Sequence, residues 1–169
     1  ALPVLDGADG DYTPGAPSRD GAALALASLE EATGLARSGE VAALVTAPVS
    51  KARLAEVGFD HPGQTEFVAY ACGYAPGDAV MMLAGPNLRT VPVTVHLALA
   101  EVPQQLTAAL IERKARITAM ALARDFGLSQ PRIAIAGLNP HAGEEGRMGD
   151  EEARLIQPAI ERLKAEGFD

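Results

Sequence analysis

Apolar residues at helical spacing predict a long helix near the start of the chain. Ser18 or Asp20 can cap its beginning, and Gly39 ends it. The same spacing predicts further helices at about residues 51–57, 65–73, 102–127 and 149–167. Thr65 is the expected cap of the helix that follows it, and Pro158 is expected to bend the last helix. The segments between these helices carry a different pattern.

Short apolar runs between the helices predict strands. These runs cover residues 41–47 (VAALVTA), 79–85 (AVMMLAG), 89–97 (RTVPVTVHL) and 132–138 (RIAIAGL). The first and last are typical of strands buried on both faces, whereas Pro92 favours an edge or a bulge in the third. Strands alternating with helices predict an α/β layered fold with a largely parallel sheet. In such folds ligands bind where the strands end.

Composition narrows the class of protein. The chain has 169 residues, of which 48% are hydrophobic and 21% charged, and this balance is typical of a globular protein. A net charge of -8 disfavours binding to nucleic acid or to an anionic membrane. The single cysteine, Cys72, cannot form an internal disulfide, and no apolar run approaches the roughly 18 residues of a membrane span. Since no signal peptide pattern opens the chain, we expect a cytoplasmic protein.

Reactive side chains follow three of the predicted strands. Lys51 comes after VTAPVS, His96 ends TVPVTVH, and His141 comes after IAGLNP. Two neutral imidazoles at neighbouring strand ends can bind one divalent metal and leave positions open for water or substrate. Asn139 and Glu144 can hold the imidazole rings by hydrogen bonds. His96 and His141 are therefore candidate metal ligands, and Lys51 is a candidate catalytic residue.

Each of these residues also has an ordinary structural explanation. A histidine at a strand end can simply be hydrogen bonded, and Lys51 can be a solvated surface charge. The acidic residues between 144 and 152 can form an exposed face, and those at its end favour a helix start through the helix dipole. The spacing of residues alone leaves both explanations open.

A second loop, HPGQTEF, contains the candidate substrate-binding residues Gln64 and Thr65. Thr65 beside Gly63 can bind a phosphate through its hydroxyl and the backbone N–H groups of a helix start, although capping explains Thr65 equally well. His61 is expected to be solvated. TAPVSK lacks the glycine spacing of a P-loop, and no G-x-G-x-x-G follows a strand. A dinucleotide would thus not bind through the Rossmann fingerprint.

Taken together, four segments resemble one family, the 4-hydroxythreonine-4-phosphate dehydrogenases of pyridoxal phosphate biosynthesis (PdxA). They are LVTAPVSK, HPGQTEFVA, VMMLAGPNLRTVPVTVHLAL and PRIAIAGLNPHAGEEGRMGDEE, in the family's order, from about Gly39 to the end of the chain. The resemblance implies the isocitrate/isopropylmalate dehydrogenase-like α/β/α layered fold, here as a partial chain. It also implies a homodimer whose active site lies between the subunits.

The resemblance further implies the chemistry. The family oxidises the secondary alcohol of 4-phosphooxy-L-threonine with NAD or NADP, and the β-keto acid then loses CO2. In the family, the histidines at the positions of His96 and His141 bind a divalent metal, for which Zn, Co, Mg and Mn are the candidates. The family usually has G-H-T-E where this chain has Gly63, Gln64, Thr65 and Glu66. Gln64 can donate a hydrogen bond but cannot titrate near neutrality, which leaves the substrate open.

Family members are longer than this chain, with segments before and after the matching region that supply the third metal-binding histidine and most nucleotide contacts. By that layout, residues 1–57 belong to a first α/β lobe and residues 58–169 to a second lobe that dimerises and binds the metal. Two alternatives stay open. The chain can belong to a related dehydrogenase of phosphorylated threonate or erythronate, or of a dihydrodiol. It can also be a truncated, non-catalytic domain.

Overall fold

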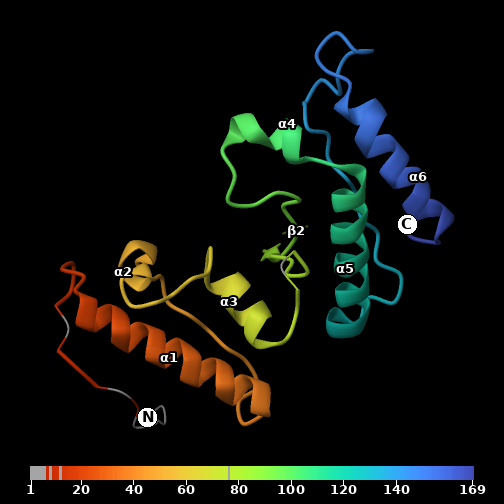
Figure 1. The fold of residues 1–169 in the computed structure, drawn as a ribbon. Helices are drawn as coiled ribbons and strands as arrows, with labels where there is room; N and C mark the ends of the chain where they lie inside the picture. The colour runs from red at the N-terminus through yellow and green to blue at the C-terminus, as the bar shows by residue number, and fades with distance from the viewer. Residues whose placement is uncertain (1–6, 8, 12, 76) are drawn as a thin grey trace. The chain divides into compact units, whose positions relative to one another are not determined.

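The structure is a computed structural model that describes residues 7, 9–11, 13–75 and 77–169. The chain forms two compact units, Ala1–Ala79 and Val80–Asp169. The helices of the first unit are α1 (Arg19–Ser38), α2 (Lys51–Ala55) and α3 (Gln64–Ala71). The second unit contains β1 (Leu83–Ala84), β2 (Arg89–Thr90), η1 (Leu99–Glu101), α4 (Val102–Gln105), α5 (Ala108–Phe126), η2 (Glu152–Ile156) and α6 (Gln157–Ala165) (Figure 1).

The first unit is built around α1, which begins and ends where the sequence predicts. The Ser18 side chain accepts a hydrogen bond of 3.0 Å from the Gly21 N–H, and Gly39 ends the helix in the left-handed conformation. The buried side of α1 packs against Leu54 at the end of α2 and Phe59 just after it. Since Phe67 of α3 joins this cluster, residues on both sides of position 57 share one core here. The lobe boundary at 57 concerns a longer protein and stays a prediction.

Two helix starts differ from the sequence prediction. Thr65 is not the cap of α3, because the backbone is still extended at Gly63, so the helix begins at Gln64 and Thr65 lies inside its first turn. The single helix predicted over residues 102–127 is also wrong. The chain turns extended at Leu106, and the Thr107 hydroxyl accepts a hydrogen bond of 3.1 Å from the Leu110 N–H, which starts α5 as a separate helix.

The predicted strands 79–85 and 89–97 form a hairpin, but a much shorter one. β1 and β2 pair antiparallel, with Leu83 opposite Thr90 and Ala84 opposite Arg89. β2 ends two residues before Pro92, which has no N–H to donate to a ladder. Among the described residues this hairpin is the only sheet, so the predicted parallel sheet is absent from them.

The runs 41–47 and 132–138 are not strands, which corrects the prediction for both. Val45, expected to be buried, is 92% exposed. In the second run, Ile133, Ile135 and Leu138 are half-buried while most positions between them are exposed, so one face packs and the other does not. An apolar pattern predicts burial, but a strand also requires a neighbouring strand to pair with its backbone groups. The described residues supply no such neighbour to either run.

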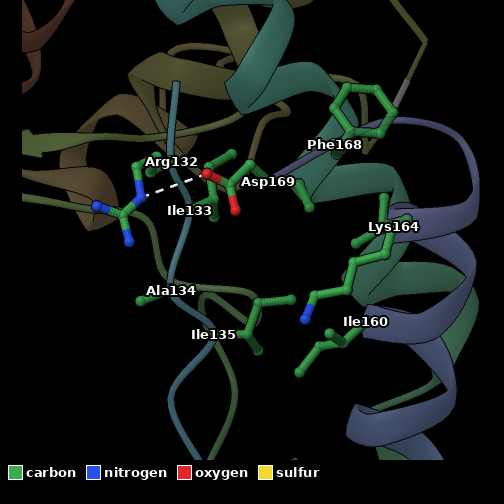
Figure 2. A pocket seen from close by; sticks show the side chains of 10 residues that line it. Arg132, Ile133, Ala134, Ile135, Ile160, Lys164, Phe168 and Asp169 are labelled. Carbon is green, nitrogen blue, oxygen red and sulfur yellow. Dashed lines mark ion pairs between the residues drawn. The ribbon is translucent and has the colours of Figure 1, made fainter. Parts of the chain in front are cut away.

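Two hollows border the run 132–138. One, of about 510 Å³, separates residues 132–135 from α6 and the end of the chain. Figure 2 shows the side chains of Ile135 and Ile160 across this hollow and the ion pair of Arg132 with Asp169, whose Nε and Oδ2 atoms are 3.3 Å apart. A second hollow, of about 640 Å³, lies between residues 131–136 and the elements β2 and α5. The Ile133 N–H also donates a hydrogen bond of 2.9 Å to the Asp169 carbonyl, so this segment is tied to the end of the chain.

The core of the second unit lies between α5 and the last helical segment. Ile111 and Leu106 pack there with Ile156 and Ala159, which is completely buried. The Glu112 carboxylate of α5 accepts hydrogen bonds from Arg162 Nε of α6 (2.7 Å) and from Arg116 Nη2 (2.9 Å). The bond with Arg162 connects α5 to α6. In the described part of the chain no helix is long and apolar enough to span a membrane.

Candidate functional site

The loop that follows the run 132–138 is organised by the side chain of Asn139. Its Oδ1 accepts a hydrogen bond of 2.9 Å from the His141 N–H, and its Nδ2 donates one of 3.1 Å to the Met148 carbonyl. One amide side chain therefore connects the beginning of the loop to its end. The sequence predicted Asn139 as a supporting residue, and the structure brings it next to His141.

The backbone of this loop is wound through left-handed conformations. Ala142, Glu144 and Glu145 have φ angles of 49°, 44° and 57°, as well as the neighbouring Gly143 with 76°. Residues other than glycine pay about 1–2 kcal/mol each for this conformation. Backbone hydrogen bonds within the loop offset this conformational cost. The Gly143 carbonyl accepts two of them, from the Gly146 N–H at 2.9 Å and from the Met148 N–H at 3.0 Å. Such strain at adjacent non-glycine residues is typical of functional loops.

Glu144 lies against the imidazole of His141. The Nδ1 atom of His141 is 3.2 Å from Glu144 Oε1, and both side chains are partly exposed. A carboxylate at Nδ1 favours the tautomer with the proton there, so Nε2 keeps its lone pair free to act as a ligand or base. The predicted association of Glu144 with His141 is thus present in the geometry, and the metal itself stays a prediction.

Glu152 is a site residue that the sequence analysis missed. Its Oε1 accepts a hydrogen bond of 2.9 Å from the Asn139 N–H, and this bond from the backbone holds the pKa of Glu152 below its usual range. In the sequence it belongs to an acidic helix start and gives no sign of pointing back at the loop. Only the chain path before the helix reveals that contact.

His96 lies in a different setting from the one predicted. It does not end a strand, because β2 stops at Thr90 and residues 91–96 belong to no strand. His96 is exposed and has a left-handed φ of 58°, just before η1. It belongs to the second unit, as His141 does. Among the described residues, no group of three or more His, Cys, Asp or Glu side chains is arranged to hold a metal ion.

The candidate substrate-binding residues lie in the first unit. Gln64 begins α3, where its amide is placed to accept from the Thr46 hydroxyl (3.4 Å) and to donate to the Ala47 carbonyl (3.5 Å). These long bonds connect α3 to the end of the run 41–47. Thr65 is exposed in the first turn of α3. The first N–H groups of a helix have no partner within the helix itself, so a helix start can bind an anion.

His61 and Lys51 complete the reactive residues of this unit. His61 is not simply solvated as predicted, because it is half-buried and its ring packs at 5.3–5.5 Å from the rings of Phe59, Phe67 and Tyr70. Lys51 is exposed and begins α2. A cation at a helix start opposes the helix dipole, so local electrostatics do not explain a lysine there.

Comparison with solved structures defines the class of protein. The chain superimposes on a 4-hydroxythreonine-4-phosphate dehydrogenase from Klebsiella pneumoniae with a TM-score of 0.82 and 37% identity, covering 93% of this chain and 47% of that one. It also matches a terephthalate 1,2-cis-dihydrodiol dehydrogenase from Burkholderia xenovorans LB400 with a TM-score of 0.62 and 31% identity, covering 93% and 50% of the two chains. The fold is one found in α/β dehydrogenases.

The family follows from the sequence comparisons. The family model described as "Pyridoxal phosphate biosynthetic protein PdxA" matches residues 1–169, so the chain belongs to the PdxA family. The 4-hydroxythreonine-4-phosphate dehydrogenase of Erythrobacter litoralis (strain HTCC2594) is 59% identical over 168 residues, which are 99% of this chain and 50% of that protein. The chain thus spans about half the length of the curated relatives it matches. The predicted family is confirmed.

Proposed function

We propose that this chain is part of an NAD- or NADP-dependent dehydrogenase that oxidises 4-phosphooxy-L-threonine, with decarboxylation, in pyridoxal phosphate biosynthesis. The observation that carries the proposal is the 59% identity to a 4-hydroxythreonine-4-phosphate dehydrogenase across nearly the whole chain. The organised loop around His141 supports it, since the strained backbone and the carboxylate beside the imidazole suit a functional loop better than a plain connection.

His141 and His96 are the residues proposed to hold a divalent metal. Neutral imidazole nitrogens suit Zn and Co, and to differing degrees Mn; Mg prefers oxygen ligands. The pairing of His141 Nδ1 with Glu144 fits this role, because it leaves Nε2 as the donor. When bound, the metal would stabilise negative charge on the substrate oxygen, and the nicotinamide would accept the hydride. A third ligand is proposed to come from outside the described residues.

The residues of the first unit are proposed to bind and orient the substrate. Thr65 and the N–H groups at the start of α3 would bind its phosphate, since a helix start favours an anion. Gln64 would donate a hydrogen bond from its amide once the long bonds to Thr46 and Ala47 are released. Lys51 is proposed to move a proton through its Nζ atom.

The proposal extends to the assembly. In the complete fold, the runs 41–47 and 132–138 would be strands of an isocitrate/isopropylmalate dehydrogenase-like layered sheet, with lobes divided near residue 57. The superposition on a 4-hydroxythreonine-4-phosphate dehydrogenase with a TM-score of 0.82 supports a shared fold. We further propose a cytoplasmic homodimer with its active site between the subunits.

The test uses the full-length product of the gene that encodes this chain. Reduction of NAD or NADP is followed with 4-phosphooxy-L-threonine after metal removal and after return of Zn²⁺, Co²⁺, Mg²⁺ or Mn²⁺. His141→Ala is expected to abolish metal-dependent oxidation while circular dichroism shows an intact fold. His61→Ala removes an imidazole outside the proposed ligand set, so it serves as the matched control for metal content. Full activity of His141→Ala with bound metal would exclude the proposed role.

A second candidate substrate class is favoured by two observations. Gln64 replaces the titratable residue expected in the motif, and the terephthalate dihydrodiol dehydrogenase shares the fold. A neutral amide suits a substrate with a hydroxyl in place of a charged group. Kinetics with phosphorylated threonate and erythronate and with a cyclic dihydrodiol separate the candidates. A strong preference for the diol would replace the leading substrate, whereas inactivity on every substrate would favour a non-catalytic domain.

A further inference from the structure

Glu152 occupies an irregular position at the start of the last helical segment. It begins η2, a π-helical turn in which the Gln157 N–H bonds to the Glu152 carbonyl before the chain continues as α6. π-helical turns are rare, and they occur frequently at functional sites. Pro158, expected to bend this helix, lies just after the turn. The irregularity therefore begins at a carboxylate that bonds to the loop.

The contacts of Glu152 form a chain that leads to His141. Glu152 Oε1 accepts from the Asn139 N–H at 2.9 Å. Asn139 in turn accepts from the His141 N–H and donates to the Met148 carbonyl. The carboxylate thus fixes the one residue that ties both ends of the loop. His141 itself carries the Glu144 contact at its Nδ1 atom.

The loop backbone lies close to the carboxylate of Glu152. A Cβ atom added to Gly137 would lie 3.3 Å from Oε1, and one added to Gly143 would lie 3.5 Å from Oε2, so the backbone on both sides comes close to the carboxylate. Hydrogen bonding to the backbone of Asn139, of Glu152 itself and of Leu138 lowers the pKa of this side chain. The carboxylate is thus enclosed by the backbone that leads into the loop.

We propose that Glu152 is a positioning residue, which acts through Asn139 on the backbone of His141 and so holds its imidazole in the orientation that binds the metal. The metal in this inference rests on the proposed function, whereas the positioning rests on the hydrogen bonds of Glu152 and Asn139. Glu152 touches neither substrate nor metal in this scheme. Hydrogen-bonded residues behind metal ligands typically change metal affinity about 10- to 100-fold when they are replaced.

The experiment compares Glu152→Ala with Glu152→Gln in the full-length gene product. Glutamine keeps an oxygen acceptor for the Asn139 N–H, whereas alanine removes it. Glu161→Ala is the matched control, because Glu161 is an exposed carboxylate of α6 that bonds Gln157 rather than the loop. If Glu152→Ala fails to fold, Glu152→Asp replaces it, since the shorter side chain withdraws the acceptor and keeps the charge.

Two measurements are made on each variant. Nitrogen NMR of labelled histidine, assigned with His141→Ala, reports the tautomer of the His141 ring without metal. Titration with Zn²⁺ reports the dissociation constant. For Glu152→Ala we expect a ring that shifts from the Nδ1-protonated form toward a mixture of tautomers, and Zn²⁺ binding weakened about 10- to 100-fold. Glu152→Gln should restore both, and Glu161→Ala should match the wild type.

The outcomes separate the two proposals. The positioning role would be overturned if the NMR shifts of the His141 ring nitrogens were unchanged in Glu152→Ala. It would also be overturned if Glu161→Ala weakened Zn²⁺ binding equally. Altered ring nitrogens with unchanged Zn²⁺ affinity would also overturn it, because the orientation would then not matter for the metal. Absence of Zn²⁺ binding in the wild type would instead refute the proposed metal site, and the ring nitrogens alone would then decide whether Glu152 positions His141.

Discussion

Gly143→Ala offers the sharpest test of how the His141 loop is built. Gly143 has a φ of 76°, and a Cβ atom added there would lie 2.6 Å from the Gly149 carbonyl oxygen. That oxygen belongs to the backbone of the same loop, so the clash cannot be relieved by turning a side chain. The substitution should therefore open the loop, which the strained residues around it already make costly to close.

A matched control lies three residues away. Gly146 has a φ of 89°, but nothing lies within 4 Å of a Cβ added there. Gly146→Ala is thus destabilising only through the left-handed conformation, by about 1–2 kcal/mol. The less flexible unfolded chain offsets about 0.4–1 kcal/mol of this. Gly143→Ala has the same conformational cost and is destabilised by about 1–3 kcal/mol more through overpacking. We expect a net loss of about 1 kcal/mol in the control and about 2–4 kcal/mol in Gly143→Ala.

The assay is amide hydrogen exchange at Met148, whose N–H bonds to the Gly143 carbonyl at 3.0 Å. A loss of about 1 kcal/mol corresponds to roughly fivefold faster exchange, and a loss of about 2–4 kcal/mol to roughly 30-fold or more. The amides of α5 should not change, because the loop opens locally. Equal acceleration by the two variants would refute the close approach of Gly143 to Gly149, and no acceleration would refute the wound loop itself.

Two further predictions concern charge. The hydrogen bonds from Arg162 and Arg116 lower the pKa of Glu112, so this carboxylate stabilises the second unit above its unfolded pKa, and the stabilisation is lost as the pH falls through the lowered folded pKa. The urea midpoint of unfolding of the wild type should therefore fall as the pH drops below about 4.5. In Glu112→Gln the midpoint should depend less on pH. If the midpoints of both proteins fell by the same amount, the stabilising role of the Glu112 carboxylate would be contradicted. Gln64→His should introduce a group that titrates near neutrality, lowering the KM for a phosphorylated substrate as the pH falls to about 6. A KM that stays independent of pH would argue against contact between this position and the phosphate.

Much of the local structure could be predicted because its causes are local. Ser18 and Gly39 bound α1 as expected, since a hydroxyl that accepts a backbone N–H and a residue free to adopt positive φ act within one helical turn. Thr107 lies inside a continuous amphipathic pattern, and its role as a cap depends on the chain turning extended at Leu106, which the pattern does not show.

The sequence by itself determined the boundaries of α1, the family and the candidate residues of the His141 loop. The tertiary structure alone decided which apolar runs have strand partners, because backbone pairing depends on segments distant in the chain. It also decided that Glu152 reaches back to Asn139 across 13 positions. In sequence Glu152 is one carboxylate among several, and only the close approach of Gly137 and Gly143 gives it a place beside the loop.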